Sequence, residues 1–374
     1  MAVARPELTI GIEEEYQLVD AETGELKGVI TQLLKDDRMI LKQIEIKPEL
    51  HQSVVEIGTR PCDSLQEARN DLLELRATVS AMASEHDARI AAAGTHPISS
   101  WRKQDISPFE RYQGVVKDMQ DAARQLLIFG MHVHVGISNP EFAIDTMNTL
   151  KYFTPHILAL STSSPFWEGR DTGLRSYRSA VFKFLPRTGV PPYFVSHAEY
   201  QKYLAVLTST ESVKDASKIY WDIRPHHEYP TLELRVCDLC TNIDDAICCA
   251  GLYQALALKH FKMRKDNIRF RRYQNALIEE NKWHAVRYGI NGKLLDLGLE
   301  EERPARDLIH ELVEFVDDVV DELGTRAEVE HALTILERGT SADIQCGLYE
   351  RTGDFKQVVD WLIEETAKPS ALSS

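Results

Sequence analysis

The residues of this chain that are best suited to chemistry occur in pairs on segments with the composition of β-strands. Three of the pairs are two residues apart, a spacing that places both side chains on one face of a strand, about 6.6 Å apart along it. The fourth brackets the segment 49–56, which ends in apolar, β-branched residues. The pairs are Glu13 with Glu15, Glu49 with Glu56, His132 with His134, and Glu233 with Arg235. Ionisable groups are costly inside a sheet unless they are paired or bind a metal ion, so neighbouring strands would gather these side chains on one polar face.

Each pair has a simpler explanation when it is taken alone. Acidic runs are ordinary on a solvated edge strand, paired histidines are often structural, and Glu-x-Arg is a common surface ion pair. Four such pairs in one chain favour a shared site instead. Carboxylate oxygens suit Mg²⁺ or Mn²⁺ better than zinc, and divalent ions, carboxylates and arginine recur in sites of phosphoryl transfer. The chain has no P-loop, no GxGxxG and no GxSxG motif, so a nucleotide would have to bind on the sheet face.

Strand patterns dominate the first two thirds of the chain, and helical patterns dominate the last third. Residues 11–20 have the composition of a strand, in which Glu14 points to the face opposite Glu13 and Glu15. We expect further extended segments over 44–58, 90–93, 126–137, 220–224 and 231–237, helices over 63–89, 141–160 and 197–209, a long loop over 165–196, and successive helices over 242–365. Since strands and helices do not alternate regularly, the predicted class is α+β with a largely antiparallel sheet. We expect one catalytic domain over 1–374, strand-rich over 8–240 and helical over 241–366.

The composition limits the range of functions. Lysine and arginine number 43 against 58 aspartates and glutamates, and the resulting net charge of −15 argues against nonspecific binding to nucleic acid or an anionic membrane. No window approaches 18 uncharged apolar residues, and the N-terminus lacks the apolar segment of a signal peptide. The six cysteines are sparse, and zinc at Cys237-x-x-Cys240 is disfavoured because Cys248 and Cys249 fall in an apparent helix. We therefore expect free thiols in a cytoplasmic protein.

Taken in order along the chain, the motifs resemble those of the glutamine synthetase superfamily. More closely, the chain resembles the glutamate–cysteine ligase type 2 group of bacterial carboxylate–amine ligases, often called YbdK-like. The shared landmarks are Gly11-Ile12-Glu13-x-Glu15, Glu49-x6-Glu56, Gly94-Thr95-His96-Pro97, Arg111-Tyr112, Gly130-Met131-His132-Val133-His134, Arg178, Trp221-Asp222-Ile223-Arg224-Pro225 and Glu233-x-Arg235-Val236-x-Asp238. The resemblance covers residues from about 8 to about 365. It implies a glutamine synthetase-like catalytic fold, in which helices flank a curved, largely antiparallel sheet and the last third is helical.

The resemblance also implies roles for individual residues. One divalent ion, Mg²⁺ or Mn²⁺, would be held by Glu15, Glu49 and Glu56, and a second ion, nearer the phosphates of ATP, by Glu13, His132 and Glu233. His134, Arg111 and Arg235 would contact ATP, with Arg235 at the γ-phosphate or the acyl phosphate. Arg178, Arg235 and Asp222 would be catalytic, and His96, Trp221 and Arg224 would contact the substrates. The base that deprotonates the amine stays open between Asp222 and Glu14.

The function implied is an ATP-dependent carboxylate–amine ligase that forms an amide through an acyl phosphate, with glutamate and cysteine as the first substrate pair. An amide hydrolase or deamidase on the same metal site is one alternative, and a nucleotide-binding regulator without turnover is another. The expected partners are small amino acids and amines, with no nucleic acid and no membrane, and a homodimer is compatible with the helical tail. Replacing Glu233 by Gln should abolish ligase activity with little loss, or even a gain, of stability, because one of several mutually repelling carboxylates is removed.

Overall fold

The computed structural model describes residues 4–36 and 45–372, so residue 44, where one predicted extended segment begins, lies outside the described residues. The longer helices are α1 (Ile30–Asp36), α2 (Leu65–Ser84), α3 (Glu110–Met119), α5 (Pro140–Leu150), α6 (Thr154–Ser161), α7 (Tyr177–Phe182), α8 (His197–Ser209), α9 (Ile243–Lys265), α10 (Asn275–Tyr288), α11 (Ala305–Phe315), α12 (Asp317–Leu323), α13 (Arg326–Arg338), α14 (Ser341–Thr352) and α15 (Phe355–Thr366), and α4 (Asp121–Arg124) is a single turn. The strands are β1 (Ile10–Asp20), β2 (Glu45–Pro48), β3 (Val54–Gly58), β4 (Ala88–Ala91), β5 (Met131–Gly136), β6 (Phe166–Trp167), β7 (Arg170–Asp171), β8 (Thr188–Gly189), β9 (Tyr220–Trp221), β10 (Ile223–Pro225), β11 (Thr231–Leu234), β12 (Lys293–Asp296) and β13 (Glu301–Pro304).

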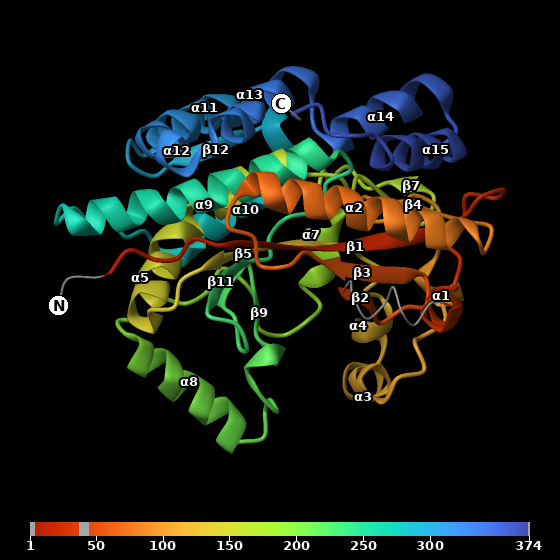
Figure 1. Cartoon of the computed structure of the whole chain (residues 1–374), viewed down its shortest axis with the longest axis horizontal. Helices are drawn as coiled ribbons and strands as arrows, with labels where there is room; N and C mark the ends of the chain where they lie inside the picture. The colour runs from red at the N-terminus through yellow and green to blue at the C-terminus, as the bar shows by residue number, and fades with distance from the viewer. Residues whose placement is uncertain (1–3, 37–44, 373–374) are drawn as a thin grey trace.

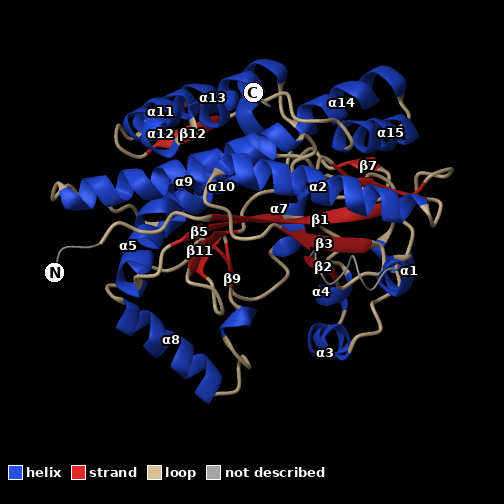
Figure 2. Cartoon of the chain, viewed as in Figure 1, coloured by secondary structure: helices blue, strands red, loops and turns tan. Residues whose placement is uncertain are grey.

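The main sheet has seven strands in the order β10-β11-β5-β1-β3-β2, with β4 paired to the later residues of β1. All of its strand pairs are antiparallel, as predicted, and β1 runs through the middle of the molecule (Figures 1 and 2). The register sets Glu13 opposite His132 and Glu15 opposite Glu56. Glu233 stands opposite His134. Four strands therefore bring the paired polar residues onto neighbouring positions of one sheet.

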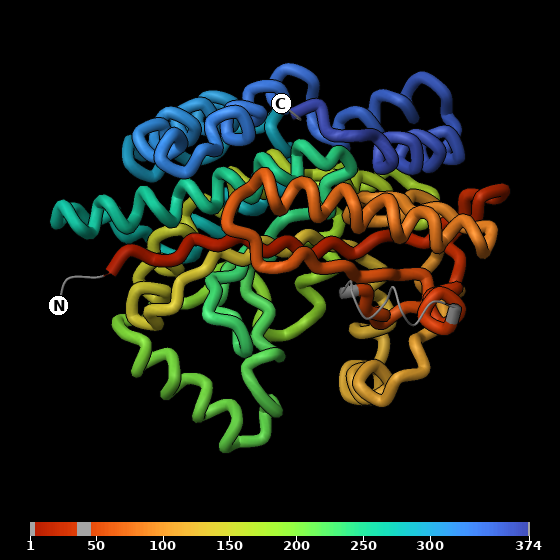
Figure 3. Tube along the Cα trace, in the orientation of Figure 1, coloured from red at the N-terminus to blue at the C-terminus, as the bar shows by residue number. Residues whose placement is uncertain are grey.

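Helices cover one face of this sheet. Figure 1 shows α2 and α9 lying along it, with α11 to α15 forming a further layer beyond them. Residues 243–258 of α9 are buried on every side, and apolar side chains from Leu8 to Leu336 belong to one buried cluster. On the opposite side of the sheet, α3, α4 and α8 extend below it in the same view (Figure 3). These helices are shorter than α2 and α9. No helix in the described part of the chain is long and apolar enough to cross a membrane.

Glu14 lies on the helix-covered side of β1, as strand alternation predicts. Its carboxylate is fully buried and accepts two hydrogen bonds from Arg76 of α2, at 2.6 and 2.9 Å. Arg76 also donates to the carbonyls of Cys240 and Thr241, which directly precede α9. This ion pair joins β1, α2 and the start of α9. Glu14 thus points away from Glu13 and Glu15 and joins elements on the helix-covered side of the sheet.

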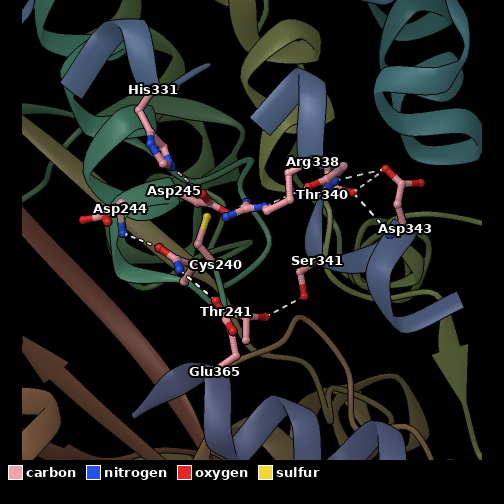
Figure 4. Close-up of polar contacts among 12 residues, drawn as sticks. Cys240, Thr241, Asp244, Asp245, His331, Arg338, Thr340, Ser341, Asp343 and Glu365 are labelled. Carbon is pink, nitrogen blue, oxygen red and sulfur yellow. Dashed lines mark hydrogen bonds and ion pairs between the residues drawn. The ribbon is translucent and has the colours of Figure 1, made fainter. Parts of the chain in front are cut away.

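The C-terminal helices are attached to the same segment by a polar network (Figure 4). Asp245, in the first turn of α9, pairs with His331 at 2.9 Å and with Arg338 at 2.6 Å, both on α13. Thr241 lies 2.6 Å from the hydroxyl of Ser341 at the start of α14. Since residues 238–245 lead directly from the polar sheet strand β11, these contacts fix the end of that strand against the helical layer.

The structure departs from the sequence prediction in three places. The predicted loop over 165–196 contains α7 and the short strands β6, β7 and β8. The predicted helix over 141–160 is interrupted by a 3₁₀ turn at 151–153, and a new helix, α6, begins at Thr154 with Pro155 in its first turn, where the missing N–H of proline is tolerated. The predicted helical third contains the hairpin of β12 and β13. All six cysteines are free and buried.

Candidate active site

A cavity of about 860 Å³ opens on the sheet face opposite α2 and α9. Ten residues that the sequence singled out line it: Glu13, Glu15, Glu49, Glu56, Arg111, His132, Arg178, Arg224, Glu233 and Arg235. Six of them lie on strands and are brought together by the antiparallel register, whereas Arg111 and Arg178 come from α3 and α7, and Glu49 and Arg235 directly follow β2 and β11. The predicted gathering of carboxylates, imidazole and guanidinium groups on one polar face is therefore present.

One end of this polar face is a group of three carboxylates, Glu15, Glu49 and Glu56. One oxygen of each lies within 4.8 Å of the other two, close enough to hold one cation. Burial, added to the charges of Glu49, Glu13 and Glu15, raises the pKa of Glu56 well above its ordinary value. Burial likewise raises the pKa of Glu15, although Arg178 opposes the shift. Such mutual repulsion is relieved by a divalent cation, and the donor set is the all-oxygen type that suits Mg²⁺ or Mn²⁺.

A second group with metal-binding geometry contains Glu13, His134 and Glu233, whose ligand atoms also lie within 4.8 Å of one another. The Nδ1 atom of His134 lies 3.0 Å from the Thr231 hydroxyl, which leaves Nε2 for another contact. That Nε2 atom is buried and has no hydrogen-bond partner among the described residues. A buried nitrogen without a partner is costly, so its environment favours a bound ligand.

His132, the predicted member of this second group, lies beside it. Its Nδ1 is 2.9 Å from a Glu13 oxygen and 3.9 Å from a Glu233 oxygen. Burial and the charge of Arg235 lower the pKa of His132 to about 4, so the ring is neutral at pH 7. The geometry thus places His134 in the compact group, where the sequence placed His132, and it keeps both imidazoles within reach of Glu13.

Two arginines clamp Glu233. The Arg224 Nε donates to one carboxylate oxygen at 2.7 Å, and Arg235 donates to the other. Burial alone would raise the pKa of Glu233, but the charges of Arg235 and Arg224 hold it well below its ordinary value. The carboxylate therefore stays ionised. It also holds the two guanidinium groups at the cavity wall.

Arg178 approaches the cavity from α7. Its guanidinium donates to the carbonyls of Arg235 and Val236, at 3.4 and 3.5 Å. Gly130, which directly precedes β5, faces it, and a Cβ at that position would overlap the guanidinium, which explains the glycine there. The Nε atoms of Arg178 and Arg235 are buried and without a hydrogen-bond partner in the described ranges. Both side chains thus keep donors for an anion.

Four residues predicted to bind ATP or substrate or to take part in catalysis, namely His134, His96, Trp221 and Asp222, are not among the residues that line the cavity as the described residues define it. His96 is fully buried, and its Nδ1 accepts hydrogen bonds from the backbone N–H groups of residues 98 and 99. Trp221 packs against an aromatic cluster of Phe194, Tyr200 and Tyr203. Asp222 forms a buried ion pair with Lys282. His96, Trp221 and Asp222 are therefore buried in the protein interior and make contacts with other protein groups.

Sequence reasoning found only Arg224 in one wall of the cavity and only Arg111 and Tyr112 in another. The segment 215–229 forms one wall, and its lining members are Asp215, Ser217, Lys218, Tyr220, Arg224, His226, His227, Glu228 and Tyr229. The other wall is apolar and comes from α3 and its neighbours: Phe109, Tyr112, Val115, Met119, Leu126 and Ile128. The spacing of residues 109, 112, 115 and 119 is helical, so an amphipathic helix could have been recognised there. Within the segment 215–229, the motif Trp221–Pro225 marks Arg224, and no motif marks the other lining residues.

Comparison with known proteins places this site in a family. Residues 9–360 match the family described as glutamate–cysteine ligase family 2. A protein of Roseiflexus castenholzii with the provisional name glutamate–cysteine ligase 2 is 57% identical over 96% of this chain and 94% of its own length. One from Herpetosiphon aurantiacus with the same provisional name is 55% identical over 96% and 93%.

Solved structures share the fold at low sequence identity. The glutamate–cysteine ligase of Francisella tularensis, solved in complex with AMP, has a TM-score of 0.70 at 16% identity and covers 98% of this chain and 90% of its own. A bifunctional glutathione synthetase of Pasteurella multocida has a TM-score of 0.70 at 15% identity, with 96% of this chain and 52% of that one covered. The predicted α+β fold class and the predicted ligase are both confirmed. The chain belongs to glutamate–cysteine ligase family 2.

Proposed function

We propose that this protein joins the γ-carboxylate of glutamate to an amine, with cysteine as the first amine to test, at the expense of ATP and with Mg²⁺ or Mn²⁺ bound. The observation that carries the proposal is the polar face of the cavity. It combines two groups of possible metal ligands with two arginines whose Nε donors are unused within the described part of the chain. This combination is typical of phosphoryl-transfer sites.

The chemistry requires activation of the acid. A carboxylate is too poor an electrophile to react with an amine at neutral pH, so the γ-phosphoryl group of ATP is first transferred to it, which forms an acyl phosphate and ADP. Charge then develops on the transferred phosphoryl oxygens. The guanidinium groups of Arg235 and Arg178 lie at the cavity wall and can donate to those oxygens, and preorganised donors of this kind stabilise a transition state strongly.

The residues present fit divalent metal ions. Glu15, Glu49 and Glu56 would hold one ion, and Glu13, His134 and Glu233 a second, with His132 hydrogen-bonded to Glu13. Bound there, the ions would supply positive charge that screens ATP from the incoming carboxylate. The neutral His132 ring and the ionised Glu233 are already in the protonation states that such a site needs. The Francisella structure, a relative in fold, was solved in complex with AMP, which supports the use of an adenine nucleotide.

We extend the proposal to the setting of the enzyme. The chain would act as one catalytic domain in the cytoplasm on small amino acid and amine substrates. Six free, buried thiols support a reducing compartment. One buried cluster contains apolar residues from Leu8 to Leu336 and so spans most of the described chain, which supports one domain.

Release of ADP tests this proposal. The purified protein is incubated with ATP, Mg²⁺, glutamate and a panel of amines that includes cysteine, and ADP and the amide are measured together. We expect ADP release that depends on both glutamate and an amine, with one amide formed per ADP. Reactions without amine, without glutamate and with EDTA are the controls. If no carboxylate gives amine-dependent ADP, the ligase proposal is wrong, and cleavage of γ-glutamyl amides without net use of ATP would favour the hydrolase.

A further inference from the structure

We propose that the buried ion pair between Asp222 and Lys282 is a positioning device that holds Arg235 at the cavity wall. The role given to Arg235 rests on the proposed function above. Asp222 is therefore a positioning residue rather than the base that deprotonates the amine. Lys282, which no sequence motif marks, belongs to the same device.

The ion pair joins two distant elements. Asp222 lies at the junction of β9 and β10, and Lys282 lies on α10. The Lys282 Nζ donates to both carboxylate oxygens of Asp222, at 2.6 and 2.8 Å. The side chains are 3% and 6% exposed, so solvent hardly weakens the contact. Both oxygens face an ammonium group, which leaves the carboxylate poorly placed to accept a proton from a substrate.

The backbone of Asp222 connects this ion pair to Arg235. Its carbonyl accepts a hydrogen bond from the Arg235 N–H at 2.8 Å, one position beyond the last paired residues of β10 and β11. Its own N–H donates to the Gly189 carbonyl of β8 at 2.9 Å. Asp222 is thus held on three sides. Displacement of this residue would move the main chain of Arg235 directly.

A second contact from α10 reinforces the same arrangement. Glu279, one turn before Lys282, accepts a hydrogen bond from the backbone N–H of Val190 at 2.7 Å. The helix α10 therefore contacts the ends of the β8–β9 strand pair through two charged side chains, Glu279 and Lys282. Burial raises the pKa of Asp222, and the charge of Lys282 opposes that shift. Buried ion pairs add little net stability compared with apolar residues, so a role in positioning accounts for this one better than stability does.

Kinetic variants test the inference. Asp222→Asn and Lys282→Met are each expected to lower kcat for amine-dependent ADP release about 100-fold, the scale of a 1 Å misplacement, with smaller changes in KM. In an Arg235→Met background, Asp222→Asn should cause no further loss of kcat, because both act through one group. Lys282→Arg should recover part of the activity. Glu328→Gln is the matched control, since it breaks the buried Arg69–Glu328 pair far from the cavity and should lower Tm without changing kcat.

Two kinetic results would overturn the inference. One is an equal loss of kcat for Asp222→Asn in the presence and absence of Arg235, as expected for an independent base. The other is an unchanged kcat for Lys282→Met. If the wild-type protein releases no amine-dependent ADP, the proposed function fails, and crystal structures of the wild type and Asp222→Asn then decide the inference alone. A displaced Arg235 guanidinium supports it, and an unmoved one contradicts it.

Discussion

Arg235→Met is expected to lower kcat for amine-dependent ADP release by about 100- to 1,000-fold, the cost of removing one preorganised donor from a developing anion. The Arg235 side chain lines the cavity. The Nε atom of its guanidinium group has no hydrogen-bond partner among the described residues, and a terminal nitrogen of the same group donates to Glu233. Because the charge on the phosphoryl oxygens grows in the transition state, KM should change much less than kcat.

Two further variants sharpen this result. Arg235→Lys keeps the charge but loses the planar fork, so it should fall between the wild type and Arg235→Met. Arg60→Met is the matched control, because Arg60 is exposed and pairs with Asp71 on the outside of the protein. Steady-state kinetics and Tm are measured for all three. An Arg235→Met enzyme that keeps wild-type kcat would show that the cavity wall has been misassigned.

Glu233→Gln is expected to lower the free energy of unfolding by about 3–5 kcal/mol, the cost of leaving a buried charge unpaired. The sequence had suggested little loss or a gain, through relief of repulsion, and the structure reverses that expectation. Glu233 is 1% exposed and sits between Arg224 and Arg235, which hold its pKa well below the ordinary value. Its ionised form therefore stabilises the fold at pH 7, and a neutral amide leaves excess positive charge in place.

Glu56, rather than Glu233, is the residue whose replacement should relieve repulsion between carboxylates. Its raised pKa means that the folded protein binds the proton more tightly than the unfolded chain, so stability falls as the pH rises above the unfolded pKa. Gln cannot ionise, and Glu56→Gln should raise the free energy of unfolding at pH 7 by about 1 kcal/mol in metal-free buffer. Urea unfolding in EDTA compares both variants with the wild type. If both substitutions changed the free energy of unfolding by the same amount in the same direction, the opposite roles assigned to Glu233 and Glu56 would be wrong.

Most of the site residues that could be predicted from the sequence were found from the alternation of side chains along strands. The period of two separates Glu13 and Glu15 from Glu14, and the structure places Glu14 against Arg76 on the other face. The same rule puts His132 and His134 together. Mixed strand and helix patterns without regular alternation were enough for the α+β class, and the antiparallel register follows from the hydrophobic faces of the strands.

Partners from distant segments could not be predicted. Asp222 pairs with Lys282, which lies 60 residues later in the sequence, and no local sequence pattern predicts that contact. The choice between His132 and His134 in the compact group depends on which residue of β11 stands opposite each of them, and the register is a tertiary property. The first part of the wall, residues 215–219, lacks a periodic signal because it belongs to the connection between α8 and β9. Sequence patterns assign faces, whereas the order and register of strands decide which side chains meet.

Isotope transfer tests the central claim, that the acid is activated as an acyl phosphate on this polar face. Glutamate that carries ¹⁸O in its γ-carboxylate is incubated with the protein, ATP, Mg²⁺ and the best amine of the panel, and the inorganic phosphate is analysed by mass spectrometry. We expect one ¹⁸O atom in each phosphate released, because the carboxylate oxygen that bonds to phosphorus leaves with it when the amine attacks. Amide formation with unlabelled phosphate would contradict the account.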